Sequence, residues 1–249
     1  MGMIFAIGGG EIGRPGYPIE TTALDREMIQ LTGKKKPRIL FLPTASGDSE
    51  EYVAVVQEHF GGRLGCEVDW LYLMKENPSY REIQEKVFSA DIVYVGGGNT
   101  AKMMRIWRRK GVDELLKKAH KRDIVLSGLS AGSICWFREG HSDSRKINGK
   151  KGEYSKVRGL GLIPAIHCPH YDIEIARRPH LRSMMQKTSG VAIAIDNCCA
   201  LEVVNEEYRI ISARKGAHAY KVYWKQGDFF EEKIPESKKF TSLLELLQK

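Results

Sequence analysis

The chain has 249 residues, 42% of them hydrophobic and 28% charged, with a formal net charge of +8 and five cysteines. This length suits one large α/β domain, and the composition excludes a disordered or fibrous chain. No run of 18 apolar residues occurs and the N-terminus lacks a basic signal region, so we expect neither a membrane span nor a secretory signal. An odd number of cysteines without metal-ligand spacing predicts a reduced, cytoplasmic protein with no metal site.

The first half of the chain shows strands alternating with helices. Short apolar or β-branched runs predict strands at residues 4–7, 38–42, 67–73, 91–95 and 124–127. The segments between them have helical spacing and predict helices at residues 22–31, 50–60, 79–88 and 101–122. This alternation is typical of βαβ units, in which a parallel sheet lies between two layers of helices.

The pattern changes after residue 190, where short turns connect the predicted strands. These strands cover residues 191–195, 200–204, 209–211 and 220–224. Short connections favour antiparallel pairing. No linker or repeat divides the chain, so we predict one domain over residues 1–249. Its predicted fold is an α/β three-layer sandwich with a mostly parallel central sheet, helices on both faces and antiparallel strands added near the C-terminus.

The positive charge is concentrated in two segments. Residues 101–122 contain nine Lys or Arg residues, and apolar residues at helical spacing among them predict a helix with a charged outer face. Residues 145–158 contain six Lys or Arg residues without a helical or strand period, which predicts a loop or hairpin. No zinc-finger, RNA-recognition or helix-turn-helix motif accompanies them, so we predict no specific nucleic-acid partner.

Residues 126–136 contain the motif expected of a nucleophile turn. Gly128-Leu129-Ser130-Ala131-Gly132 fits G-x-S-x-G, with an apolar strand before it and an apolar helical start at residues 134–137 after it. The glycines permit a strained backbone that presents the Ser130 hydroxyl, and the N–H of Ala131 is suited to stabilise an oxyanion. The motif therefore predicts that Ser130 is a nucleophile. Two more glycine turns, residues 8–10 and 96–98, also follow predicted strands, where ligands bind in parallel sheets.

A serine nucleophile needs a base, and His170 is the best-placed histidine. It follows the apolar run 165–168 and Pro169 at an expected strand end, whereas His167 is expected inside that strand. His141 and His180 have polar or charged neighbours, so we expect both at the surface.

The group that orients His170 stays open between two neighbours. Asp196 and Asn197 follow the predicted strand 191–195, again at a strand end. A carboxylate would stabilise the protonated imidazole, whereas an amide would hold its tautomer without offsetting its charge. The order serine, histidine, acid along the chain differs from that of α/β-hydrolases, which argues against an ordinary lipase or esterase.

Four segments together resemble the peptidase E (aspartyl dipeptidase) family, to which the cyanophycinases are related. They are GLSAGSICW at residues 128–136, VGGGNT at 95–100, FLPTAS at 41–46 and CPHYD at 168–172. The resemblance implies a fold related to the class I glutamine amidotransferases, with serine in place of their cysteine. It also implies a serine peptidase without metal or cofactor that hydrolyses short peptides, above all dipeptides with an N-terminal Asp.

The resemblance also assigns residues by motif. It implies Ser130 as nucleophile, His170 as general base, and the N–H groups of Ala131 and Gly98 as oxyanion donors. The family has a Glu where the flanking strands place Asn197.

A shift of one residue would put Asp196 at the position of that Glu instead, and Asp143 is a weaker third candidate for the orienting acid. Gly97, Asn99 and Arg178 are the implied substrate-binding residues. The basic segment 145–158 is a further candidate for substrate contacts.

Two other functions stay open at this point. One is a related acyl hydrolase that cleaves β-aspartyl, cyanophycin-like or ester bonds, and the other is a binding protein that has kept the serine turn without catalysis. The expected partner is a small peptide with an acidic residue, and the sequence is compatible with a homodimer.

Overall fold

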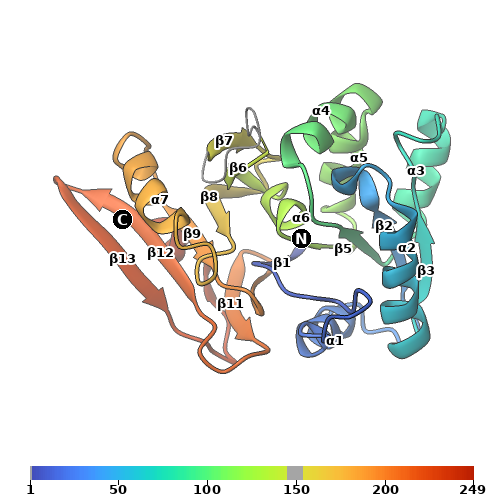
Figure 1. The fold of residues 1–249 in the computed structure, drawn as a ribbon, viewed down its shortest axis with the longest axis horizontal. Coiled ribbons are helices and arrows are strands. Elements are labelled where there is room, and N and C mark those ends of the chain that lie inside the picture. Colours follow the sequence, from blue (N-terminus) through green and yellow to red (C-terminus); the bar gives the residue numbers. More distant parts are fainter. Residues whose placement is uncertain (1, 145–153) are drawn as a thin grey trace.

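The protein, seen here in a computed structural model that describes residues 2–144 and 154–249, contains two β-sheets. The larger sheet has eight strands in the order β14-β11-β10-β1-β5-β4-β2-β3, and the smaller has six in the order β13-β12-β9-β8-β6-β7. Figure 1 shows the smaller sheet and the C-terminal strands on one side, and the first parallel strands on the other.

Five parallel strands form the larger part of the eight-stranded sheet. They are β1 (Met3–Ile7), β2 (Arg38–Leu42), β3 (Glu67–Trp70), β4 (Ile92–Val95) and β5 (Val125–Leu129). The antiparallel strands β10 (Cys199–Val204), β11 (Glu207–Ser212) and β14 (Thr241–Ser242) extend this sheet beyond β1. The antiparallel addition near the C-terminus is therefore confirmed.

Alternating side chains bury both faces of the parallel strands. In β1, Phe5 and Ile7 face one hydrophobic core, whereas Ile4 and Ala6 face another. The first core is covered by α1 (Thr22–Gln30) and α2 (Glu50–Val56), which continues as a π-helical segment (Gln57–Arg63). The second core is covered by α3 (Tyr80–Ser89), α4 (Thr100–Lys110) and α5 (Val112–Ala119). The predicted arrangement of helices on both faces is confirmed.

The basic segment 101–122 forms two helices where one was predicted. Gly111 separates α4 from α5 with φ 72°, a left-handed conformation that ends a helix at little cost in glycine. The predicted apolar side, including Met103 and Trp107, is fully buried, and Arg105, Arg108 and their basic neighbours line the outer side.

The six-stranded sheet carries the rest of the chain. Its strands are β6 (Phe137–Ser142), β7 (Ser155–Arg158), β8 (Ile163–Pro169), β9 (Ala192–Ile195), β12 (Ala219–Lys225) and β13 (Asp228–Ile234). One face packs against α7 (Arg177–Gln186) through Leu181 and Met185. The other face shares its core with the larger sheet and with α8 (Leu243–Leu247). The division into two sheets and the strands β6, β7 and β13 were not predicted.

One prediction in this region was wrong. The helix after Ser130 spans only Ala131–Ile134, and the apolar residues that were expected to continue it lead into β6. The predicted loop or hairpin at 145–158 ends in β7, which pairs with β6, whereas residues 145–153 lie outside the described part of the chain.

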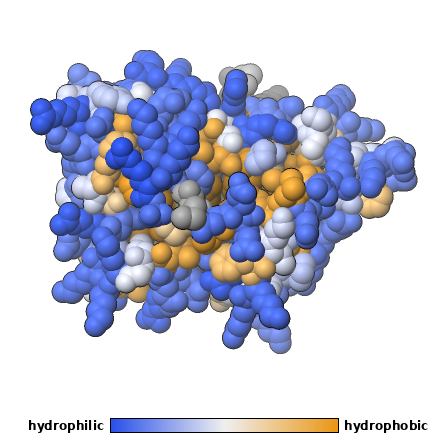
Figure 2. Space-filling model, turned by 180° about the vertical axis from the view of Figure 1, so that it is seen from behind, coloured by the Kyte–Doolittle hydropathy of each residue, from blue (hydrophilic) through white to orange (hydrophobic). Residues whose placement is uncertain are grey.

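The surface is dominated by polar side chains. Figure 2 shows hydrophilic residues over most of the rear face and hydrophobic residues in its centre. No helix within residues 2–144 and 154–249 has both the length and the apolar character needed to cross a membrane.

Candidate active site

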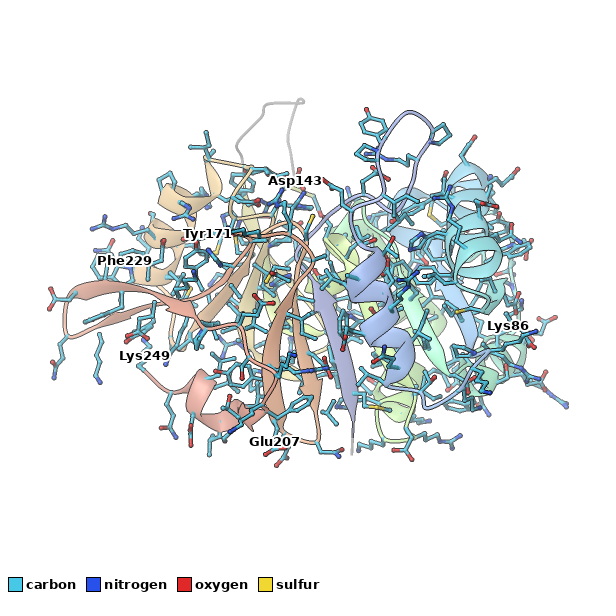
Figure 3. The ribbon with its side chains drawn as sticks, turned by 90° about the horizontal axis from the view of Figure 1, so that it is seen from below. Lys86, Asp143, Tyr171, Glu207, Phe229 and Lys249 are labelled. Atoms are coloured by element: carbon cyan, nitrogen blue, oxygen red, sulfur yellow. The ribbon has the colours of Figure 1, made fainter. Side chains whose placement is uncertain are left out.

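The predicted catalytic residues meet where strands of both sheets end. Ser130 directly follows β5 of the larger sheet, whereas His170 follows β8 and Asn197 lies just beyond β9 in the smaller sheet. Figure 3 shows this edge with Asp143, at the opposite side from Glu207, where β11 begins. The site therefore lies at the carboxyl ends of parallel strands, where ligands bind in open α/β sheets.

Ser130 occupies a strained turn. Its φ of 55° and ψ of −114° are rarely adopted by residues other than glycine. The two glycines of the motif are required by close packing, because a Cβ at Gly128 or Gly132 would overlap the carbonyl oxygen of Val95 in β4. The backbone N–H of Ser130 donates to the carbonyl of Ile7 in β1, 3.2 Å away. The turn is thus held against both strands that flank β5.

Ser130, His170 and Asn197 form a continuous hydrogen-bonded series. Nε2 of His170 lies 2.5 Å from Oγ of Ser130, and Nδ1 lies 2.8 Å from Oδ1 of Asn197. An amide oxygen can only accept, so Nδ1 carries the proton and Nε2 is free to accept from the serine hydroxyl. This is the tautomer that a general base needs, and the amide fixes it without adding charge.

The environment of His170 favours the neutral ring. Burial lowers the pKa of His170 below its usual value of 6.5, and the bond to Asn197 acts in the opposite direction. The nearby Arg177 lowers this pKa further, whereas the carboxylates of Glu174 and Asp143 raise it. His170 is therefore available as a base at neutral pH.

Replacing Asn197 with aspartate is expected to move the acid limb of the pH profile to higher pH. A carboxylate beside Nδ1 would stabilise the imidazolium and raise the pKa of His170. As the pH falls, His170 would therefore become protonated, and activity would decline, at a higher pH than in the unmodified protein. The measurement is kcat/KM against pH for both proteins. Asn77→Asp, at an exposed asparagine that binds Lys110, is the control. An unmoved acid limb in Asn197→Asp would show that this position does not govern the base.

Of the two candidate orienting groups, the amide rather than the carboxylate contacts His170. Asp196 is buried, and its Oδ2 accepts the backbone N–H of His218 at 2.9 Å, on the other side of the turn. Asn197 is held in place by Asp172, whose Oδ1 accepts the backbone N–H of Asn197 at 2.9 Å and whose Oδ2 pairs with Arg214. The alternative in which Asp196 orients the base is wrong for this geometry.

Gly9 lies against the His170–Asn197 pair. A Cβ at this position would overlap both Nδ1 of His170 and Oδ1 of Asn197. The neighbouring Gly8 is equally close to the carbonyl of Asp196. The first glycine turn thus lets the chain pass directly over the base and its orienting amide.

The second glycine turn lies beside the nucleophile. A Cβ on Gly97 would be 3.6 Å from Cβ of Ser130. The backbone N–H of Gly97 donates to the Tyr52 hydroxyl at 3.3 Å. Gly98 has φ 138° and packs on the carbonyl of Ala45, so only glycine fits there.

Two predicted substrate-binding residues make contacts within the protein. Asn99 caps α4 by accepting the N–H of Lys102 at 2.8 Å, and its amide nitrogen donates to the carbonyl of Ser144 at 3.1 Å. Arg178 binds Oε1 of Glu231 at 2.8 Å and packs on the Tyr171 ring, which Figure 3 labels. Neither side chain lies among the described residues that line the pocket at Ser130. Arg178 is half-buried on α7 and lies next to the acidic strand β13, which explains its pairing with Glu231.

His141 was expected at the surface and is buried. Its Nε2 lies 2.9 Å from Nδ1 of His180, and its carbonyl accepts a hydrogen bond from Arg177 at 2.8 Å. Burial, with the Arg177 and His180 charges, lowers the pKa of His141 to about 2. Its polar neighbour Ser142 gave the wrong indication because that residue is buried in β6 as well. His167 is inside β8 as expected, bonded to Ser133 at 2.8 Å.

A pocket of about 1150 Å³ opens beside the predicted catalytic residues. Its floor includes Ser130, His170 and Asn197, one wall is the segment from Gly10 to Tyr17, and the other is the first two turns of α2 and its continuation. Figure 3 shows the segment before α1, in the violet-blue of the N-terminal residues, projecting at the edge that carries Asp143.

Several residues of this site were not predicted from the sequence. Tyr52 and Arg214 lie in no motif, Asp172 ends the CPHYD segment but had been given no role, and the segment 10–17 reads only as a polar, glycine-containing connection. Gly9 belongs to the glycine turn 8–10, which was predicted to lie near a ligand. Its position just after a parallel strand is the sequence feature that could have indicated its place at the site.

Fold and site together define a class of protein. A strained serine between two glycines, at the end of a parallel strand and bonded to an oriented histidine, is the arrangement that serine hydrolases use for acyl transfer.

The comparisons identify the family within this class. Residues 4–211 match the model of peptidase family S51, and the chain belongs to this family. It is therefore a peptidase, and the expected relation to peptidase E is confirmed.

Individual relatives agree with this assignment. The chain is 36% identical to the uncharacterized peptidase YgaJ of Bacillus subtilis (strain 168), over 94% of this chain and 98% of the relative. It is 29% identical to peptidase E of Streptomyces coelicolor, over 54% of this chain and 51% of the relative. The crystal structure of a peptidase from an acI-B1 actinobacterium has the same fold, with a TM-score of 0.74 at 19% identity, covering 97% of each chain.

Proposed function

We propose that Ser130, His170 and Asn197 are the catalytic residues of a peptidase that hydrolyses short peptides through an acyl-enzyme. The observation that carries the proposal is the 2.5 Å contact between Oγ of Ser130 and Nε2 of a half-buried, oriented His170. Such a contact lets the histidine remove the hydroxyl proton as the serine attacks.

The proposed reaction has two halves. In the first, Oγ of Ser130 bonds to the peptide carbonyl carbon while Nε2 of His170 takes the proton, and the protonated His170 then gives it to the leaving amine as the C–N bond breaks. In the second, His170 takes a proton from water, the water oxygen attacks the ester carbon, and the proton returns to Oγ as the acid leaves. The N–H groups of Ala131 and Gly98 are the proposed donors to the oxyanion in both halves.

The substrate is proposed more broadly than the sequence resemblance implies. A preference for an N-terminal Asp would need a cation at the pocket, and the residue predicted for this task, Arg178, is bound to Glu231. We therefore propose short peptides as substrates without this restriction. Asp-X dipeptides, β-Asp-X dipeptides and aryl esters form the panel that separates the peptidase from the other acyl hydrolases.

The direct test is covalent labelling. Diisopropyl fluorophosphate is expected to modify Ser130, located by peptide mass spectrometry, because an unactivated serine reacts poorly. His170→Gln, which removes the base and keeps a polar side chain, is expected to slow the labelling. Intact Ser130 after incubation with the reagent would refute the proposal and favour a non-catalytic binding protein.

A further inference from the structure

The pocket next to Ser130 is acidic, although the chain as a whole is basic. Among residues 2–144 and 154–249, the charged residues that line it are four glutamates and one arginine, a net formal charge of −3. They are Glu11, Glu20, Glu51, Glu58 and Arg14.

The arginine is already neutralised within the pocket wall. Nε of Arg14 lies 2.6 Å from Oε2 of Glu11, and the guanidinium lies 4.7 Å from the centre of the Tyr17 ring. The other oxygen of Glu11 accepts the backbone N–H groups of Ile12, Gly13 and Arg14. Glu11 contacts Nε and Nη2 of Arg14, so a substrate carboxylate at the remaining N–H groups would meet a guanidinium whose charge is already compensated.

Two of the glutamates have no cation in direct contact, although Lys75 lies near Glu51 and Arg214 lies near Glu20. Oε2 of Glu20 accepts the backbone N–H of Glu11 at 3.0 Å, and Oε2 of Glu51 accepts the Ser49 hydroxyl at 2.8 Å. Within residues 2–144 and 154–249, neither is in an ion pair, whereas Glu58 pairs with Arg63. The hydrogen bond from Ser49 lowers the pKa of Glu51, so this carboxylate is ionised at neutral pH.

Apolar side chains cover much of the surface between these carboxylates. Ile12 and Tyr17 come from the segment 10–17, Tyr52 and Val55 from α2, and Ile173 from the segment after His170. A long aliphatic stem that ends in a cation suits such a surface, because the stem contacts apolar groups while the charge reaches a carboxylate. An aspartate side chain would meet like charge.

We propose that this pocket selects short peptides with Lys or Arg next to the bond that Ser130 cleaves, and discriminates against Asp. The proposal rests on the proposed function of Ser130 and adds its substrate class. Glu20 and Glu51, on opposite walls, attract the cationic side chain of the substrate. Arg14 is paired with Glu11 and so offers an acidic substrate no uncompensated cation.

Binding to a protein that cannot turn over tests the proposal separately from the chemistry. For Ser130→Ala, titration calorimetry with Lys-Ala, norleucine-Ala and Asp-Ala is expected to give a Kd at least about tenfold lower for Lys-Ala than for Asp-Ala, with norleucine-Ala between them. Equal or tighter binding of Asp-Ala would overturn the proposal, whether or not Ser130 is the nucleophile.

Turnover by variants tests the assigned glutamates. Glu20→Gln combined with Glu51→Gln is expected to lower kcat/KM for Lys-Ala by about tenfold and to leave that for norleucine-Ala within about twofold. Glu85→Gln, at an exposed glutamate paired with Arg81 on α3, is the control and should change neither value. An equal loss for both substrates would overturn the assignment. Unlabelled Ser130 in the fluorophosphate experiment would overturn the proposed function and this proposal with it.

Discussion

Replacing Ser130 with alanine is expected to lower kcat/KM for peptide hydrolysis by at least about 10⁴-fold, as in other enzymes that lose a catalytic serine. The loss follows from the chemistry, because no other hydroxyl is bonded to Nε2 of His170 within the described residues. Alanine has no greater difficulty than serine with the positive φ at this position, so the free energy of unfolding should change little.

The measurement is steady-state kinetics on the cleaved dipeptide, with urea unfolding to establish that the variant is folded. Ser89→Ala is the matched control, since that exposed hydroxyl bonds only to the carbonyl of Lys86 near the end of α3. Activity close to that of the unmodified protein in Ser130→Ala would mean that the bond is cleaved elsewhere.

The substitution Gly9→Ala is expected to lower kcat by about 10²-fold, because misplacing a catalytic group by about 1 Å has an effect of this size. The added methyl group would overlap the two atoms that form the hydrogen bond between His170 and Asn197. Both are side-chain atoms, so the pair can shift, and the damage falls on alignment rather than on the backbone. The predicted loss is therefore in turnover, with only a small loss of stability.

Gly16→Ala provides a comparison in the same segment of the chain. Its Cβ would meet nothing within 4 Å, and its φ of 83° makes alanine strained there, which costs about 1 kcal/mol. It should lower the free energy of unfolding and leave kcat within a few-fold. If Gly9→Ala lowered kcat no more than Gly16→Ala does, close packing at Gly9 would not be what aligns the base.

Local signals in the sequence were sufficient to select the two residues, Ser130 and His170, that lie in contact in the structure. Ser130 lies in a motif whose glycines have a steric purpose, and His170 follows an apolar run that is indeed β8. Asn197 was harder, because a turn can present either of two neighbouring side chains. Which one faces the ring depends on Asp172 and Arg214, and these residues are distant in sequence from Asn197.

The other features of the fold and site could not be predicted because they depend on contacts between residues far apart in the sequence. The ion pair of Arg178 depends on Glu231, which lies 53 positions further along the chain in β13. That strand was not predicted. The division into two sheets also depends on which short strands pair, and periodicity within a strand contains no information on its partner. The acidic pocket was missed because its glutamates come from segments that have no motif in common.

The placement of Ser130 and His170, the proposed catalytic pair, makes activity a sensitive measure of how the two sheets pack. Ser130 is attached to one sheet and His170 to the other, so their 2.5 Å contact spans a boundary at which β10 packs on β9 and β12. A small sliding of one sheet on the other would separate Oγ from Nε2 while both hydrophobic cores stayed folded. On heating, we therefore expect inactivation to precede the loss of secondary structure.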